Sequence, residues 1–218
     1  DGENKELMIL CFSLHGFSDI NQLLGREKGD EIIWDISLRI TQELGDDFSF
    51  VRLGGVRFAV VSDTVLDPDE PVLIIRKIVK EIYRKHQISI IYTCSVGLLR
   101  SPRDGSTVSK LLENAEILMN VAADTVEGAY LEFSPSLAKK YHDESELSMA
   151  LNQCINQKFK GFRIVIQPQV RAKDGKIFGG EVLLRWRYKG EDVAPCRFIP
   201  ILEKTDLIVP VGKWVAAQ

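Results

Sequence analysis

The chain has 218 residues, of which 45% are hydrophobic and 27% are charged, and these proportions are ordinary for globular proteins. The composition excludes wholesale disorder and collagen-like or low-complexity architecture. The 28 basic and 31 acidic side chains give a formal net charge of −3, and no basic cluster is long enough to follow a phosphate backbone, so we expect no nucleic-acid partner. The length suits one complete domain with a substantial remainder.

Hydrophobic runs and cysteine spacing favour a cytoplasmic protein with no membrane contact from this segment. The longest apolar runs, such as residues 7–12, are too short to cross a bilayer, and residues 1–4 lack a signal-peptide pattern. The first residue is not methionine, which favours a piece of a longer protein. The cysteines are widely spaced without a metal-ligand rhythm, so we expect reduced core residues rather than disulfides: Cys11, Cys94, Cys154 and Cys196.

The first 133 residues alternate between buried β segments and amphipathic helices. We expect strands at 7–13, 48–53, 57–62, 88–99 and 130–133, and helices at 27–44, 71–86 and 108–123. The sequence Gly54-Gly55-Val56 between two of these strands predicts a tight hairpin, because glycine tolerates positive φ. This order of elements predicts an α+β domain whose mainly antiparallel sheet is covered by helices.

The remaining residues show a different pattern. We expect a helix at 144–159, strands at 162–167 and 181–187, a short helix at 198–204 and a last helix that begins near Gly212. The 144–159 helix is interpreted as a connector, and the roughly 60 residues after it are too few to bury a core of their own. The expected organisation is a domain at 1–140, a connecting helix at 141–160 and an incomplete domain at 161–218.

The hairpin sequence at 52–58 resembles the signature turn of GGDEF domains, the diguanylate cyclase family. Further matches follow the family's order from about residue 7 to residue 133: Phe17, Ile20-Asn21, Gly25, Gly29-Asp30, Ser95-Val96-Gly97 and Asp104-Gly105. The resemblance implies a degenerate GGDEF-like domain with the α+β fold expected above.

A second resemblance begins at Phe162. Gln167-Pro168, residues 180–186 and residues 195–203 are similar to the opening of EAL domains, which are cyclic di-GMP phosphodiesterases, although the EAL triplet reads Glu-Val-Leu here. The resemblance implies a TIM-barrel-type fold, of which this chain contains only about the first quarter. GGDEF and EAL domains adjoin in this order in bacterial signalling proteins.

The strands of an incomplete barrel leave open edges and an uncovered apolar face, which are costly in water. We therefore expect the side chains of four residues to be buried against the first domain, the 144–159 helix or a second chain: Ile164, Ile166, Leu184 and Trp186.

The phosphate half of the GGDEF site lacks the family's chemistry. The family pattern has two acidic residues after Gly-Gly and an aspartate at the end of the first strand, and these positions hold Val56, Arg57 and Ser13. Joining two GTP molecules requires metal ions, and a positive charge here would repel Mg²⁺. The family's phosphate-contacting lysine and arginine align with Ala123 and Ala129. We expect no cyclase activity.

The base half is better preserved. Asn21 and Asp30 stand where the family contacts guanine, and with Gly54 and Gly55 they are the candidate residues for binding GTP or another guanine nucleotide. A structural interpretation stays open, because Asp30 near a helix start is favoured by the helix dipole and Asn21 can cap a turn.

In the EAL portion, the resemblance makes Glu181 the first metal ligand, while Gln167 and Arg185 would contact cyclic di-GMP. The alternative is that all three are ordinary polar positions on barrel strands. An intact EAL domain uses Mg or Mn, but Glu181 alone cannot hold a catalytic metal pair, so we expect no cofactor in these 218 residues.

The leading hypothesis is a catalytically inactive GGDEF regulatory domain followed by the start of an EAL domain, from a bacterial cyclic di-GMP signalling protein. The GGDEF domain would bind a guanine nucleotide or form a homodimer surface. Two alternatives stay open: the parent is an active metal-dependent cyclic di-GMP phosphodiesterase, or both halves form a purely structural protein-interaction module.

Overall fold

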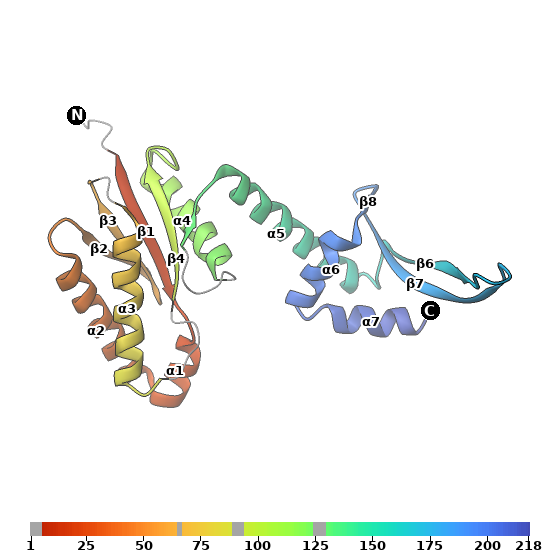
Figure 1. The fold of residues 1–218 in the computed structure, drawn as a ribbon, viewed down its shortest axis with the longest axis horizontal. Coiled ribbons are helices and arrows are strands. Elements are labelled where there is room, and N and C mark those ends of the chain that lie inside the picture. Colours follow the sequence, from red (N-terminus) through yellow and green to blue (C-terminus); the bar gives the residue numbers. More distant parts are fainter. Residues whose placement is uncertain (1–5, 65–66, 89–93, 124–129) are drawn as a thin grey trace. The chain divides into compact units, whose positions relative to one another are not determined.

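The computed structural model describes residues 6–64, 67–88, 94–123 and 130–218 (Figure 1). The chain forms two compact units, Asp1–Lys139 and Lys140–Gln218, and each is described by itself. Within the described residues, no helix has both the length and the apolar content needed to span a bilayer.

The first unit is built on a sheet with strand order β2-β3-β1-β4-β5. Its strands are β1 (Leu7–Leu14), β2 (Ser49–Gly54), β3 (Arg57–Ser62), β4 (Cys94–Ser101) and β5 (Leu131–Glu132). Its helices are α1 (Phe17–Leu24), α2 (Arg26–Leu44), α3 (Asp69–Lys85) and α4 (Val108–Ala122). Strand β1 pairs antiparallel with β3 and β4, β2 pairs antiparallel with β3, and β5 pairs parallel with β4.

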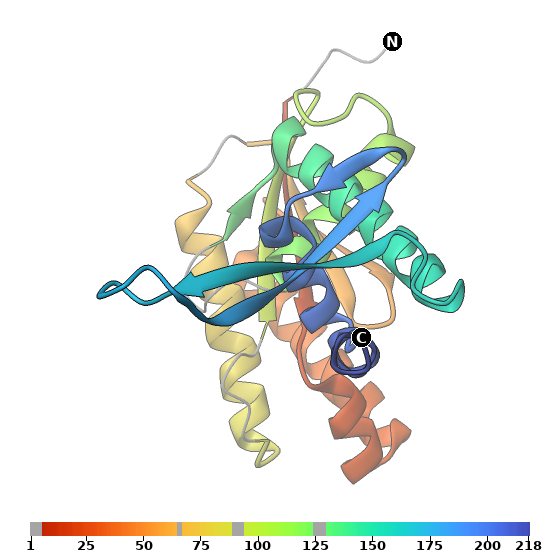
Figure 2. The ribbon, with the colours of Figure 1, turned by 90° about the vertical axis from the view of Figure 1, so that its right-hand side faces the viewer.

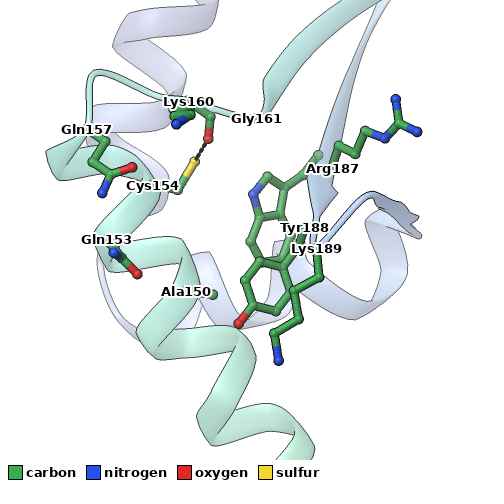
Figure 3. Close-up of a pocket in the computed structure, with 10 residues that line it drawn as sticks. Ala150, Gln153, Cys154, Gln157, Lys160, Gly161, Arg187, Tyr188 and Lys189 are labelled. Carbon is green, nitrogen blue, oxygen red and sulfur yellow. Dashed lines mark hydrogen bonds between the residues drawn. The ribbon is translucent and has the colours of Figure 1, made fainter.

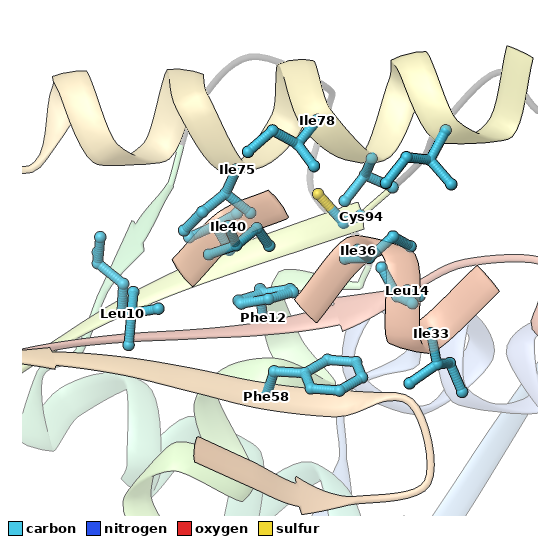
Figure 4. Close-up of a cluster of buried hydrophobic side chains, with 14 of the residues drawn as sticks. Leu10, Phe12, Leu14, Ile33, Ile36, Ile40, Phe58, Ile75, Ile78 and Cys94 are labelled. Atoms are coloured by element: carbon cyan, nitrogen blue, oxygen red, sulfur yellow. The ribbon is translucent and has the colours of Figure 1, made fainter. Parts of the chain in front are cut away.

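Helices cover both faces of this sheet. The alternation of strand side chains sends Leu10, Phe12 and Leu14 of β1 into a core with α2 and α3 (Figure 4). The residues between them, including Cys11, enter a second core under α4. Helix α4 approaches the sheet closely, because a Cβ atom on Gly97 of β4 would lie 2.5 Å from Leu118.

The α+β class and the mainly antiparallel sheet are confirmed, and the predicted elements lie within a few residues of the observed ones. Helix α1 was not predicted, because its eight residues are few for a periodic pattern and Gly25 separates it from α2. The expected strand at 88–99 is described from Cys94 onward, since residues 89–93 lie outside the described ranges.

The second unit contains a sheet with strand order β6-β7-β8. Helix α5 (Pro135–Asn156) precedes the strands β6 (Phe162–Val170), β7 (Ile177–Tyr188) and β8 (Glu191–Val193), and helices α6 (Pro195–Lys204) and α7 (Ile208–Ala216) follow them. All the strands pair antiparallel, and β6 and β7 form a long twisted hairpin (Figure 2). Helix α5 is longer at its start than the predicted 144–159 helix.

One face of the hairpin base packs on helices. Trp186, Phe198 and Leu202 are almost fully buried, in one cluster with Leu151 of α5. The expectation that the residues after 160 lack a core of their own omitted α5, which contributes several of the buried side chains.

The expected burial of the barrel-like strands is only partly observed. Trp186 is buried, while Ile164 and Leu184 are half-buried. The prediction was wrong for Ile166, which is 69% exposed. Ile166 pairs with Val182 further along the hairpin, which extends past the helices of its unit (Figure 1).

The cysteine expectation also holds only in part. Cys11, Cys94 and Cys154 are buried free thiols. Cys196 was wrongly expected in the core and is exposed, because it lies in the first turn of α6, whose buried side carries Phe198 and Leu202.

Replacing Trp186 by alanine tests whether the second unit has a core of its own. We expect Trp186→Ala to lower the free energy of unfolding by about 3–5 kcal/mol, because removing a large buried side chain leaves a cavity. Urea unfolding followed by circular dichroism measures it. Met149→Ala on α5, where the side chain is 70% exposed, is the control and should change little. Equal effects of the two substitutions would contradict the packing.

Candidate functional site

The β2–β3 turn is fixed from two sides. Gly54 and Gly55 have φ of 135° and 55°, which disfavour other residues. The Arg52 guanidinium donates two hydrogen bonds to the Gly55 carbonyl oxygen, at 3.1 and 2.9 Å. At the end of β1, the Leu14 amide donates to the Val56 carbonyl oxygen at 3.0 Å. The turn is therefore attached to the strand end from which α1 follows.

Strand register brings Ser13 and Arg57 together. Ser13 of β1 lies opposite Arg57 of β3 and, on its other side, opposite Ser95 of β4. The neighbours Phe12 and Phe58 point into the α2–α3 core, so these three polar residues face α4.

Arg57 is held by α4. Its guanidinium donates to Asn120 Oδ1 at 3.0 Å and lies 3.4 Å from Glu116 Oε1. The neighbouring Val56 packs at the edge of the α2–α3 core. Within the described ranges, no group of three or more His, Cys, Asp or Glu side chains could hold a metal ion. This end of the sheet therefore presents a fixed cation.

Two expected phosphate positions add no charge here. Ala123 directly follows α4 and is exposed, and Ala129 lies outside the described residues.

Asn21 and Asp30 lie on adjoining helices. A Cβ atom on Gly29 of α2 would overlap Oδ1 of Asn21, so the Asn21 amide rests against the backbone beside Asp30. Asn21 is half-buried and Asp30 is exposed. Among described residues, neither α1 nor α2 has a side-chain cap, and Asp30 is the fifth residue of α2, where the dipole effect has weakened. The capping interpretation therefore loses support.

The candidate residues of the second unit share one face of its sheet. Gln167 of β6 lies opposite Glu181 of β7, and Arg185 follows four residues later on the same face. Gln167 and Glu181 are exposed, while the half-buried Arg185 donates to the Leu184 carbonyl oxygen at 2.9 Å. Trp186 lies on the opposite, helix-covered face.

A hollow of about 240 Å³ lies between α5 and β7 (Figure 3). Its buried end holds Cys154, whose thiol donates to the Lys160 carbonyl oxygen and whose pKa is raised by burial. At its rim, Lys189 forms an ion pair with Glu146 at 2.7 Å. A protonated thiol is a poor nucleophile, so this hollow offers no evident chemistry.

Comparison with known families identifies both parts. Residues 1–127 match the family described as diguanylate cyclase, GGDEF domain. The chain belongs to the GGDEF family. Residues 146–218 match the EAL domain. Both resemblances drawn from the sequence are confirmed, and the order is that of the GGDEF–EAL proteins of cyclic di-GMP signalling.

Several bacterial proteins are similar to the chain. The bifunctional diguanylate cyclase/cyclic di-GMP phosphodiesterase MucR of Pseudomonas aeruginosa is 30% identical over 98% of this chain and 31% of its own length. The cyclic di-GMP phosphodiesterase PdeR of Escherichia coli is 27% identical over 98% of this chain and 32% of its own length. An X-ray structure of an EAL/GGDEF domain protein from M. capsulatus matches 62% of this chain and 89% of its own, with 25% identity and a TM-score of 0.44. The chain spans about a third of the length of these curated relatives.

Sequence reasoning missed the residues that hold Arg57. Glu116 and Asn120 lie 59 and 63 residues from Arg57, so no local pattern links them to it. Their i, i+4 spacing does place them on one side of α4, which was the available signal. Ser95 was noted only as part of a family match, and its place beside Ser13 follows from strand register.

The contact between Asn21 and Gly29 can be tested with a double-mutant cycle. Gly29→Ala alone must displace the Asn21 amide, whereas in the Asn21→Ala background the new methyl group meets less obstruction. We expect the effect of Gly29→Ala on the free energy of unfolding to be more favourable by at least about 1 kcal/mol in that background. Urea unfolding of the four proteins gives the coupling energy, and strictly additive effects would show that the two residues do not touch.

Proposed function

We propose that the GGDEF portion makes no cyclic di-GMP and serves as a regulatory domain that binds guanine nucleotide weakly. The observation that carries this proposal is the guanidinium of Arg57, which faces α4 directly opposite Ser13. In the family pattern both positions are acidic and serve metal ions. A bound arginine in place of these carboxylates repels a divalent cation and leaves no oxygen ligand set for it.

Asn21 and Asp30 support the nucleotide part of the proposal. The Asn21 amide rests beside the Asp30 position, so an amide and a carboxylate converge from two helices. A carboxylate accepts hydrogen bonds from the N1–H and amino groups of guanine, and an amide donates to its carbonyl oxygen. In the intact protein, nucleotide bound here would bias the EAL domain. We place this activity in the cytoplasm, and a homodimer remains part of the proposal.

For the second unit, we propose that β6 and β7 are the first strands of a TIM-barrel-type EAL domain, with the polar face directed toward substrate. The shared face of Gln167, Glu181 and Arg185 supports this proposal. A metal pair does not fit these residues by themselves, because Glu181 supplies the single carboxylate among them. An active phosphodiesterase therefore requires residues outside this chain, and a parent of that activity is the second candidate function.

The absence of cyclase activity is directly testable. We expect no cyclic di-GMP after incubation with GTP and either Mg²⁺ or Mn²⁺, because the acidic metal site is replaced at Ser13, Val56 and Arg57. Chromatography of the reaction measures the product against a no-protein control. Product that forms at a rate proportional to protein concentration would overturn the proposal.

Guanine binding is testable by calorimetric titration with GTP. We expect weak binding that changes little when Mg²⁺ is removed, and a roughly tenfold loss in Asp30→Ala, since a charged hydrogen-bond partner is lost. Glu27→Ala removes an exposed carboxylate from the same helix and should leave the affinity unchanged. An unchanged affinity in Asp30→Ala would favour the purely structural function.

A further inference from the structure

The sheet end under α4 carries polar groups that the guanine contact does not use. Arg57, Ser13 and Ser95 form a row across β3, β1 and β4, all facing α4. The row begins beside the β2–β3 turn, and α1 with Asn21 follows directly after β1. A ligand whose base meets Asn21 therefore has this end of the sheet nearby.

Ser95 is an unusual residue in this row. Its side chain is only 4% exposed, and within the described residues its hydroxyl oxygen has no hydrogen-bond partner. Buried hydroxyl groups are nearly always paired, because an unpaired one loses its hydration without compensation. The Ser95 hydroxyl and the Ser13 hydroxyl beside it can donate to an incoming oxygen atom.

The contacts of Arg57 are weak enough to be exchanged. Its 3.4 Å separation from Glu116 exceeds the roughly 2.7–2.9 Å of strong charge-assisted hydrogen bonds. Glu116 is 66% exposed and Arg57 is 38% exposed, so water screens this ion pair. Arg52 differs, because its guanidinium already donates twice to the Gly55 carbonyl oxygen.

We propose that the row is a metal-free oxyanion site that takes a phosphate group of a guanine nucleotide. This inference rests on the proposed nucleotide function. Arg57 leaves Glu116 and donates to phosphate oxygens, with the hydroxyl groups of Ser13 and Ser95 as further donors. A guanidinium and two hydroxyl groups can all donate to an oxyanion, whereas they offer poor ligands to a metal ion. The position that serves a cation in the family has thus reversed its charge preference.

The test uses the whole 218-residue chain in EDTA, titrated with GTP, guanosine and inorganic tripolyphosphate. Tripolyphosphate probes the phosphate contact without a base, and guanosine probes the base without phosphate. We expect GTP and tripolyphosphate to bind, and Arg57→Ala to weaken both at least tenfold while guanosine binding is unchanged. Glu116→Gln removes the competing carboxylate and should tighten GTP binding about two- to fivefold.

Arg39→Ala is the matched control. Arg39 is 37% exposed and is paired with Glu43 and Glu81, so its removal changes the net charge equally, away from the row. This variant should bind GTP as the unchanged chain does. Arg57→Lys keeps the charge but loses the planar fork, and an intermediate affinity is expected. Thermal unfolding of each variant establishes that it is folded.

The outcomes separate this inference from the proposed function. If GTP and guanosine bind equally and Arg57→Ala changes neither, the oxyanion site is overturned while the guanine contact stands. If tripolyphosphate binds through Arg57 and guanosine does not bind, the oxyanion site stands and the guanine contact fails. If Arg39→Ala weakens GTP binding as much as Arg57→Ala, general charge explains the effect and the site is overturned. If none of the three compounds binds, both ideas fail.

Discussion

The position of one guanidinium determines the chemistry of the first unit. Arg57 is the first residue of β3, and the strand register leaves it opposite Ser13 and directed at α4. Asn120 and Glu116 then fix the end of its side chain. A metal site requires anionic oxygen ligands converging on an empty position, and here the chain supplies the positive charge itself. Any ligand at this end of the sheet must therefore be neutral or negatively charged.

That position depends on the antiparallel pairing of β1 with β3 and β4. The same alternation that buries Leu10, Phe12 and Leu14 under α2 and α3 turns Ser13 toward α4. A shift of one residue in register would place the phenylalanine ring of Phe12 on the α4 side and Ser13 in the larger core. Hydrophobic burial along the whole strand thus fixes the geometry of a polar site at its end. The second unit follows the same logic, since Trp186 is buried on one face of β7 and Arg185 lies on the other.

The sequence was informative where the signal is local. Periodicity identified the main strands and long helices, and Gly54-Gly55 marked a turn whose backbone angles favour glycine. It failed where burial depends on partners distant in sequence. Ile166 has the pattern of a core strand residue, but it lies too far along the hairpin for the helices to cover it. The partners of Arg57 were likewise invisible, because they are brought to it by the packing of α4 on the sheet.

The guanine and phosphate contacts of the first unit have different physical bases and therefore different consequences. Asn21 is held against Gly29 in a half-buried position, and hydrogen bonds to a base edge made there distinguish guanine from other bases. Arg57 carries charge at a partly exposed position, so its attraction for phosphate is indifferent to the base and is screened by salt. Specificity must consequently come from the α1–α2 side and much of the affinity from the sheet end. Because Glu116 competes for the same guanidinium, the empty site keeps its charge partly neutralised, and a ligand gains only the difference between the two partners. A weak, guanine-selective and metal-independent response follows from that difference.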